Sequence, residues 1–266
     1  MSTLTLRQEP PERLDFLHVT PLSLSGLSET EAARLPIGTS RRGLTLGDVF
    51  AISLDGSDSL TIEGGSSRFD SVGASLSGGS IRVVGDVGQR LGAGMASGSV
   101  TVTGSAGPYA GSGAKGGTIT IEGDAGDHAG GAVYAAKAGL DGATLVICGS
   151  AGDYLGDRMR RGLILVGAAG AHAGSRMIAG TIAALSVGDH PGYGMRRGTI
   201  LAGGHGALSP SFAETGTHDL VFLRLLARSL RALSPAHADL AAGALKRYSG
   251  DLATLGKGEL WVTAGR

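Results

Sequence analysis

Short runs of alternating apolar and polar residues recur along the middle of the chain, each followed by a glycine-rich stretch. In one of them, Val100 and Val102 point one way and the intervening threonine points the other. This two-residue period is typical of a strand with one buried face. Eight such runs predict strands: Leu60–Ile62, Ile81–Val84, Val100–Val102, Ile119–Ile121, Thr144–Ile147, Leu163–Val166, Ile182–Leu185 and Ile200–Ala202.

The glycine-rich stretches share the pattern Gly-x3-Gly-x2-Met-x2-Gly. A degenerate copy, at Gly107 and Gly111, carries Ala114 where methionine is expected. Every methionine except Met1 therefore occupies one position of the repeat, which predicts a structural role in packing. The complete copies are Gly88/Gly92/Met95/Gly98, Gly152/Gly156/Met159/Gly162, Gly170/Gly174/Met177/Gly180 and Gly188/Gly192/Met195/Gly198.

A period near 20 residues predicts stacked coils of chain that bury their apolar edges against their neighbours. No helix-length pattern separates consecutive runs, so we expect a mainly β protein built as a parallel β-helix of about eight coils. Equivalent glycines lie 18 or 19 residues apart, except for a step of 26 between Gly126 and Gly152. The longer step predicts an insertion of about seven residues, which we place in Gly131–Leu140 as a projecting loop.

The repeats occupy residues 58–208, and we expect two flanking segments. Residues 1–57, with strand-like stretches at Leu4–Leu6 and Leu44–Leu54, are expected to cap the first coil. Residues 209–266 form a C-terminal helical extension and tail. There we expect Thr217 to cap a helix with a leucine stripe, a second helix from Ser234-Pro235 to about Arg247, and a terminal strand at 259–262. The helices either cap the open end of the solenoid or bind a partner.

Composition narrows the class of protein. Charged residues make up only 17% of the chain and the formal net charge is zero. The low charge suggests that other subunits cover part of the surface, and the neutral balance argues against nucleic-acid and membrane partners. The sequence has no signal-peptide pattern and no long apolar segment, so we expect a cytoplasmic protein. The single cysteine, Cys148, ends an apolar run, and we expect a buried, inert thiol.

One column of the repeat carries mostly planar side chains. Two positions after the first glycine, the chain has Arg90, Tyr109, His128, Tyr154, His172 and His190. We interpret this column as stacked rings that fill a corner of each coil. A metal bridged by two neighbouring histidines is the alternative, but no third ligand is shared by those coils, and we predict no metal site.

Basic residues are the best candidates for binding. They recur at repeat spacing on one edge: Arg158, Arg160, Arg161, Arg176, Arg196 and Arg197, with Lys115 and Lys137 nearby. One interpretation is a solvated face with scattered carboxylate partners such as Asp157 and Asp189. The other is a strip that binds the carboxylates of a partner subunit or of a polyanionic ligand. We predict no catalytic residue, because the sequence has no nucleophile motif and no Cys/His pairing.

The repeats at Gly152–Gly162, Gly170–Met177 and Gly188–Gly198 resemble those of the C subunits of formylmethanofuran dehydrogenases. The resemblance extends over about residues 58–205 and includes the bacterial counterpart, the C subunit of the formyltransferase/hydrolase complex of methylotrophs. More distantly, the chain resembles the C-terminal β-helix domain of glutamate synthase. The composition favours the bacterial complex.

The family resemblance implies a right-handed parallel β-helix and a non-catalytic scaffold subunit in a one-carbon enzyme complex. The implied partners are a formyltransferase subunit, a metal-dependent amidohydrolase subunit and a dehydrogenase-like subunit. The complex would move formyl from a tetrahydromethanopterin carrier to methylofuran or methanofuran and release it as formate. The chain itself would bind no cofactor directly, since the metal belongs to a partner.

Three alternatives stay open at this point. The chain could be the C subunit of an archaeal-type formylmethanofuran dehydrogenase, or a structural β-helix domain like that of glutamate synthase. The third is a carbohydrate-active β-helix enzyme, which would need paired carboxylates or bound calcium on one flank. Asp153 and Asp189 share a column, but Ala171 lies between them.

Overall fold

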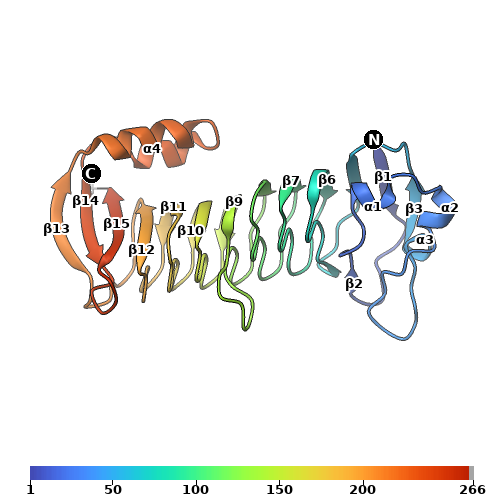
Figure 1. Cartoon of the computed structure of the whole chain (residues 1–266), viewed down its shortest axis with the longest axis horizontal. Helices are drawn as coiled ribbons and strands as arrows, with labels where there is room; N and C mark the ends of the chain where they lie inside the picture. Colours follow the sequence, from blue (N-terminus) through green and yellow to red (C-terminus); the bar gives the residue numbers. More distant parts are fainter. Residues whose placement is uncertain (264–266) are drawn as a thin grey trace.

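The computed structural model describes residues 1–263 and shows an elongated molecule (Figure 1). It is mainly β, with one large sheet of 13 strands and one small sheet of two strands. The strands are β1 (Ser2–Leu6), β2 (Leu14–Asp15), β3 (Phe50–Ser53), β4 (Ser59–Glu63), β5 (Phe69–Asp70), β6 (Ser77–Val84), β7 (Ser97–Val102), β8 (Thr118–Ile121), β9 (Asp141–Ala151), β10 (Arg161–Ala169), β11 (Thr181–Val187), β12 (Arg197–Ala202), β13 (Ala213–His218), β14 (Leu245–Gly250) and β15 (Lys257–Thr263). The helices are α1 (Pro21–Leu24), α2 (Glu29–Ala32), α3 (Leu46–Val49), α4 (Val221–Arg231) and α5 (Pro235–Leu240).

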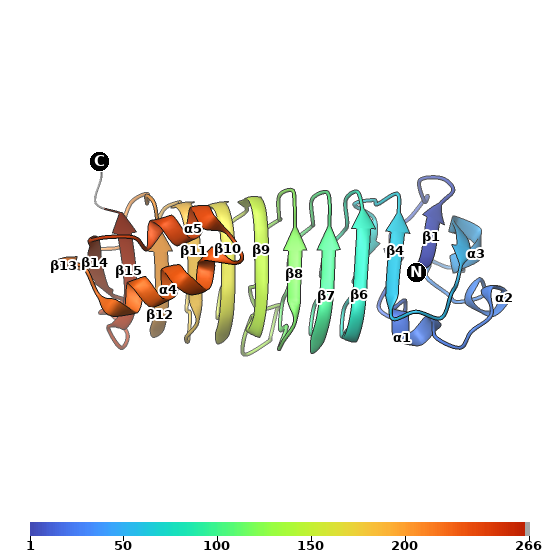
Figure 2. The ribbon, with the colours of Figure 1, turned by 90° about the horizontal axis from the view of Figure 1, so that it is seen from above.

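The large sheet is mostly parallel, and strands β6 to β12 lie side by side in chain order (Figure 2). Each of the eight strands predicted from the sequence is confirmed, as β4 and β6 to β12. Like residues pair across the repeats: Ile81 with Val100, and Val100 with Ile119. Ile119 then pairs with Leu145, 26 positions later, so the inserted residues leave the strand register intact.

Successive repeats are also hydrogen-bonded outside these strands. Isolated parallel bridges join Val87 to Ala106 and Ala106 to Ala125. At a further corner, the N–H of Gly111 donates to the carbonyl of Leu91 at 2.7 Å, and equivalent bonds recur along the molecule. Each repeat is therefore fixed to the next at three places around its turn, which satisfies most of its backbone polar groups.

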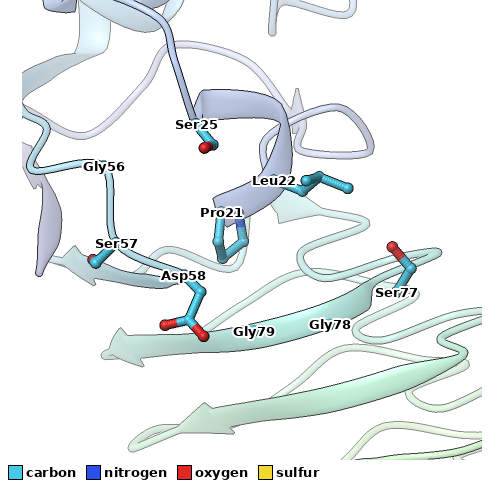
Figure 3. Close-up of a pocket in the computed structure, with 9 residues that line it drawn as sticks. All are labelled: Pro21, Leu22, Ser25, Gly56, Ser57, Asp58, Ser77, Gly78 and Gly79. Carbon is cyan, nitrogen blue, oxygen red and sulfur yellow. The ribbon is translucent and has the colours of Figure 1, made fainter.

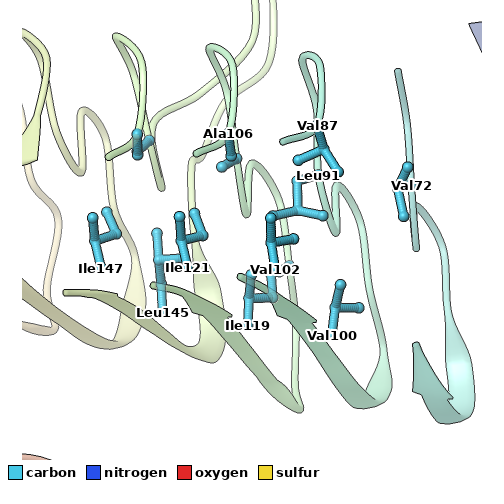
Figure 4. Close-up of a cluster of buried hydrophobic side chains, with 14 of the residues drawn as sticks. Val72, Val87, Leu91, Val100, Val102, Ala106, Ile119, Ile121, Leu145 and Ile147 are labelled. Carbon is cyan, nitrogen blue, oxygen red and sulfur yellow. The ribbon is translucent and has the colours of Figure 1, made fainter. Parts of the chain in front are cut away.

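The core runs along the length of the molecule between these ladders. Val100, Ile119 and Leu145 stack in one column, and Val102, Ile121 and Ile147 stack in the next (Figure 4). All six side chains are buried. Because each repeat covers only the apolar residues of its two neighbours, the stability of the stack depends on contacts between adjacent repeats.

The methionines of the repeat lie inside this core. Met95, Met159, Met177 and Met195 are fully buried. In two motifs the last glycine makes room for the methionine of the preceding repeat: a Cβ on Gly180 would lie 2.8 Å from the Cε of Met159, and a Cβ on Gly198 would lie 2.9 Å from the Cε of Met177. The second glycines of the motif, Gly92, Gly156, Gly174 and Gly192, all have φ between +60° and +72°, a conformation that favours glycine.

The N-terminal residues pack against the first repeat. β1 runs parallel to β4 and antiparallel to β3, and three aromatic rings, Phe16, Phe50 and Phe69, contact one another with centroids 4.9–5.9 Å apart. The predicted strand at Leu4–Leu6 is confirmed within β1. The stretch 44–54 is a strand only in β3. A reciprocal capping box between Thr45 and Asp48 starts a helical turn, α3, before that strand.

The C-terminal helices cover the outer face of the last strands. Figure 2 shows α4 and α5 lying across β10, β11 and β12. A second buried cluster joins them to the sheet, with Leu223 and Leu230 of α4 against Leu201 and Trp261. The predicted terminal strand is confirmed as part of β15, which pairs in parallel with β12.

The predicted start of the second C-terminal helix is confirmed, with Ser234 at the N-cap and Pro235 as the first helical residue of α5. The predicted start of the first helix and the predicted end of the second were wrong. Thr217 does not cap a helix, because it lies in β13 and pairs with Lys246 of β14. α4 starts four residues later, at Val221, without a side-chain cap. α5 ends at Leu240 rather than near Arg247, since Arg247 pairs with Trp261 in the antiparallel β14–β15 ladder.

The prediction for Cys148 was also wrong, because its side chain is exposed. Leu145 and Ile147 occupy the buried face of β9, so strand alternation turns Cys148 outward. Within residues 1–263, no helix is long and apolar enough to cross a membrane.

Candidate functional site

Two basic residues of the repeat, Arg158 and Arg176, lie at one corner of the molecule. Arg158 and Arg176 occupy the same position in neighbouring repeats, with φ of 55° and 53°. The N–H of Arg158 donates to the carbonyl of Ser175 at 2.8 Å, and the N–H of Arg176 donates to that of Tyr193 at 2.7 Å. These corner hydrogen bonds hold both residues in the left-handed conformation, so the two guanidinium groups leave adjacent turns side by side.

One buried carboxylate lies beneath both arginines. Arg176 donates to Asp157 through Nε at 2.9 Å and through Nη2 at 2.8 Å, and the Nε of Arg158 lies 3.9 Å from Asp157 Oδ2. Asp157 is almost fully buried. Since a single carboxylate faces two guanidinium groups, the corner retains net positive charge. The sequence hypothesis had treated Asp157 as a surface partner, whereas the structure places it as the base of the site.

The inserted residues close over this corner. Gly131–Gly139 form a loop, which we call the inserted loop, between Gly130 and β9. The Nη1 of Arg158 donates to the carbonyl of Ala136 at 3.0 Å, and Lys137 follows in the loop. The expectation of a loop in 131–140 agrees with the irregular backbone of these residues.

Two adjacent hollows share Arg158 and Arg176. The first, of about 400 Å³, lies under the inserted loop against Tyr109, His128 and Asp157. The second, of about 440 Å³, continues toward the C-terminal end. It is lined by Lys137, Arg158, Arg176, Ile178, Gly194, Arg196 and Thr254. We call the surface formed by Lys137, Arg158, Arg176 and Arg196 the basic groove.

Charge in the basic groove is unbalanced. Among residues 1–263, neither Lys137 nor Arg196 has a carboxylate within 4 Å. The groove thus presents four cationic groups over one buried carboxylate. Such an arrangement suits a ligand with several carboxylates, which arginine binds through paired N–H donors.

The far end of the groove is braced by the loop between β14 and β15. Asp251 accepts hydrogen bonds from the N–H groups of Gly194 at 2.9 Å and Ala253 at 2.8 Å. Burial raises the pKa of Asp251, but hydrogen bonds from Ser211, Gly194 and Ala253 outweigh it and lower the pKa below its ordinary value. Thr254 donates to the carbonyl of Met195 at 2.6 Å. A charged Asp251 therefore fixes the backbone of Gly194 in the groove.

The other predicted arginines lie outside the groove. Arg160 and Arg161 are 3.6 and 3.0 Å from the carboxylate of Asp141 on β9. Arg197 is exposed on β12, where it pairs in register with Lys257. The structure therefore brings together Arg158, Arg176 and Arg196, and it separates them from the remaining three. Asp189, the other expected carboxylate partner, instead accepts from the N–H of Ala207 at 2.7 Å.

The predicted ring stack is confirmed, and two of its members, Tyr109 and His128, line the first hollow. Ring centroids of Tyr109, His128, Tyr154 and His172 are 4.9–5.0 Å apart, with interplanar angles of 6–12°. His190 continues the stack at 5.6 Å. Arg90, Tyr109, His128, Tyr154, His172 and His190 all have φ between 54° and 63°. Over the described part of the chain, no three His, Cys, Asp or Glu side chains come together as a metal site.

A separate hollow of about 260 Å³ lies at the N-terminal end between α1 and β6 (Figure 3). Its lining includes the apolar Pro21 and Leu22 and the polar Ser57, Asp58 and Ser77. None of the residues predicted to bind a ligand lies there. Serine hydroxyls and one carboxylate beside apolar side chains suit a small polar or cationic group, but no feature of the sequence had indicated this hollow.

Comparison with known proteins gives a full-length match. The chain is 77% identical over 265 residues to the C subunit of the formyltransferase/hydrolase complex Fhc of Methylorubrum extorquens, covering 99% of this chain and 100% of that protein. It also matches a chain in the X-ray crystal structure of the formyltransferase/hydrolase complex FhcABCD from Methylorubrum extorquens in complex with methylofuran. That match has a TM-score of 0.97 and 76% identity, over 99% of this chain and 100% of the other. No protein-family model matches the sequence.

Proposed function

This chain belongs to the family of the C subunits of formyltransferase/hydrolase complexes, and from that premise we propose that it is the non-catalytic scaffold of such a complex. The complex would transfer formyl from formyl-tetrahydromethanopterin to a methylofuran-type carrier and hydrolyse it to formate, in the cytoplasm. The observation that carries the proposal is 77% identity over essentially the whole length of both chains. Formyl transfer, hydrolysis and the catalytic metal would belong to partner subunits.

The architecture of the chain supports the scaffold role. We propose that the stacked repeats form a right-handed parallel β-helix, with residues 58–208 as its body and residues 1–57 and 209–266 as its ends. Strand pairing in chain order and backbone bonds at further corners support this architecture. A stack of this kind is a stiff rod with long flanks. It suits a subunit that holds others at fixed distances.

The test of the scaffold proposal compares the chain alone with the assembled complex. Co-expressed with the three other subunits, the wild-type chain should co-purify with them, and the assembly should transfer and hydrolyse formyl. The chain purified alone should do neither. Robust formyl transfer or formyl hydrolysis by the isolated chain would reject a non-catalytic role, and failure to co-purify would reject membership of the assembly.

We further propose that the basic groove binds a chain of carboxylates. Arg158, Arg176 and Arg196 from the predicted set contribute, together with Lys137. Two sources have this chemistry: an acidic segment of a partner subunit and the glutamate-rich tail of the furan carrier. The unbalanced charge of the groove supports the proposal, because a bound carboxylate would meet Lys137 and Arg196, which have no carboxylate within 4 Å among residues 1–263.

Charge reversal tests the groove without disturbing the buried Asp157. The double variant Lys137→Glu/Arg196→Glu should bind carboxylate ligands at least about tenfold more weakly. The matched control is Arg161→Glu, an exposed arginine of the neighbouring strand that already has an acidic partner. Weaker assembly would identify a partner segment as the ligand, and a raised KM for the carrier in intact complex would identify its tail. Unchanged assembly and unchanged KM would refute the groove as a binding site.

A further inference from the structure

The inserted loop carries a fully exposed aromatic side chain at its tip, whereas Ala132 at its start is buried. Residues 132–136 are Ala, Val, Tyr, Ala and Ala in succession. Figure 1 shows the loop that precedes β9 extending beyond the connections of the neighbouring repeats. At its tip the Tyr134 side chain is 97% exposed, the highest value among the large hydrophobic residues. A ring this exposed adds almost no buried apolar area to the fold of its own chain.

The inserted loop is not needed to complete the fold. Its ends rejoin the repeat as in the neighbouring turns: the carbonyl of Leu140 accepts from Arg160 N–H, as the carbonyl of Met95 accepts from Lys115 N–H. Leu140 thus takes the place of the repeat methionine and is fully buried. Between Gly131 and Gly139, the seven residues 132–138 are surplus to the repeat. Their sequence is free to serve another purpose.

Hydrogen bonds nevertheless hold the loop in one shape. The N–H of Ala136 donates to the carbonyl of Val133 at 3.0 Å, which closes a turn around Tyr134. The N–H groups of Ala132 and Gly139 donate to the carbonyls of Asp157 and Arg158 at 3.1 and 3.0 Å. With the bond from Arg158 to Ala136, the loop is fixed to the next repeat at both sides. A segment ordered before it binds loses little conformational entropy on binding.

The residues of the inserted loop are of the types that anchor protein–protein interfaces. Tyrosine supplies a large rigid contact area with one polar end, and such residues dominate the binding energy of interfaces when they enter a pocket. The half-buried Val133 precedes the ring and the small Ala135 follows it, so little side-chain bulk stands between the ring and a partner surface. Lys137 and Arg158 stand beside the tip, so the facing surface is expected to be acidic around an apolar centre.

We propose that the inserted loop is a docking element whose Tyr134 side chain enters an apolar, acid-rimmed pocket on another subunit of the complex. This inference rests on the proposed function, since it takes the partner to be a subunit of the same assembly. The basic groove and the loop are then two parts of one edge. The groove binds carboxylates, and the loop supplies the apolar contact.

Three variants of the full-length chain, co-expressed with the other subunits, test the proposal. Tyr134→Ala should weaken binding of the chain to the remaining subunits by about tenfold or more, and Tyr134→Phe should retain most of the affinity because the ring remains. Deletion of residues 132–138 removes Lys137 of the basic groove as well as Tyr134, so it should weaken binding at least as much as Tyr134→Ala. This deletion shortens the Gly126-to-Gly152 step from 26 to 19, the ordinary spacing of the repeat, so the chain should still fold.

Leu22→Ala provides the matched control, because Leu22 is 72% exposed and lies in α1, near the N-terminal end of the molecule and away from the inserted loop (Figure 1). It should leave assembly unchanged, and all variants should keep the thermal midpoint of the wild-type chain. If Tyr134→Ala and the deletion variant assemble like the wild type, the proposal is wrong. It is equally wrong if they assemble normally but raise the KM for the carrier, because the loop then binds ligand. A wild-type chain that fails to assemble would instead refute the proposed function.

Discussion

At the scale of single residues, side chains on the corners of this molecule act mainly on the next repeat. Asp70 illustrates this, since it joins the N-terminal segment to the first turns. It accepts from the Nε of Arg13 at 2.6 Å and from the backbone and side chain of Gln89 at 3.0 and 3.1 Å. Burial raises the pKa of Asp70, but hydrogen bonds from Arg13 and Gln89 prevail, so the pKa lies below the ordinary 3.8.

The lowered pKa of Asp70 predicts acid-sensitive stability. The carboxylate favours the folded state at every pH above the unfolded pKa near 3.8, and this contribution disappears as the pH falls through the lower folded pKa. Asp70→Asn should therefore reduce the free energy of unfolding by about 1 kcal/mol at about pH 6. The gap between wild type and variant should narrow as the pH is lowered from about 4 to about 2.5. Urea unfolding at several pH values measures this difference in the free energy of unfolding. A difference that does not change with pH would contradict the prediction.

The sequence predicts the position of a residue well where that residue has the same neighbours in every repeat. The methionine and ring columns follow from spacing alone, because each member has the same neighbours one repeat away. Cys148 was misplaced because its apolar predecessors were read as a buried run, when strict alternation from Ile147 would have turned it outward. Asp157 lies beneath two arginines because Arg158 and Arg176 have a left-handed backbone conformation, and the spacing of residues in the sequence does not predict that conformation.

At the scale of elements, the backbones of neighbouring repeats approach each other closely at the last glycine of each motif. Gly98 has φ +91°, and a Cβ there would lie 2.4 Å from the carbonyl oxygen of Gly79 in the preceding repeat. This contact is to backbone, so no side-chain rotation can relieve it. Any larger residue must push two repeats apart.

A pair of alanine substitutions separates this steric effect from backbone conformation. Gly98→Ala should cost about 3 kcal/mol, since it adds overlap with backbone to the left-handed penalty. Gly113 also has a positive φ, +67°, but a Cβ there meets nothing within 4 Å. Gly113→Ala should therefore cost only about 1 kcal/mol. The denaturant midpoints of the two variants measure their losses of stability. Equal losses would show that the positive φ alone accounts for glycine at both positions.

Elements outside the repeat were the hardest to predict. The leucine stripe from Leu220 to Leu233 correctly indicates a helix, because a helix carries its own period. The start of that helix and the end of the next were set by pairing of β13 and β14 with β15, between strands that are distant in the chain. The helix or strand propensity of a local segment cannot predict such long-range contacts. For the same reason, Arg247 appeared helical in sequence and is a strand residue in the structure.

At the scale of the whole molecule, the candidate site joins segments that are far apart in the chain. The basic groove combines Lys137 of the inserted loop with Arg196 and, at its end, Thr254. Repeat spacing correctly placed Arg158 and Arg176 in neighbouring positions. It could not show that Asp141 would neutralise Arg160 and Arg161, because the inserted residues break the repeat just before Asp141.

The C-terminal cover gives a prediction for the whole molecule. Removal of everything after Gly203 would expose the free edge of β12 and the apolar face formed by Leu165, Ala183 and Leu201, which α4, α5 and Trp261 now bury. Unpaired edges and apolar faces promote self-association. The truncated chain should therefore elute as large oligomers or precipitate, where the full-length chain alone stays in solution. Trp261→Phe retains the edge pairing and most of the apolar area, so this control should remain soluble. A truncated chain that is monomeric by light scattering, with unchanged circular dichroism per repeat, would show that the repeats need no cover at this end.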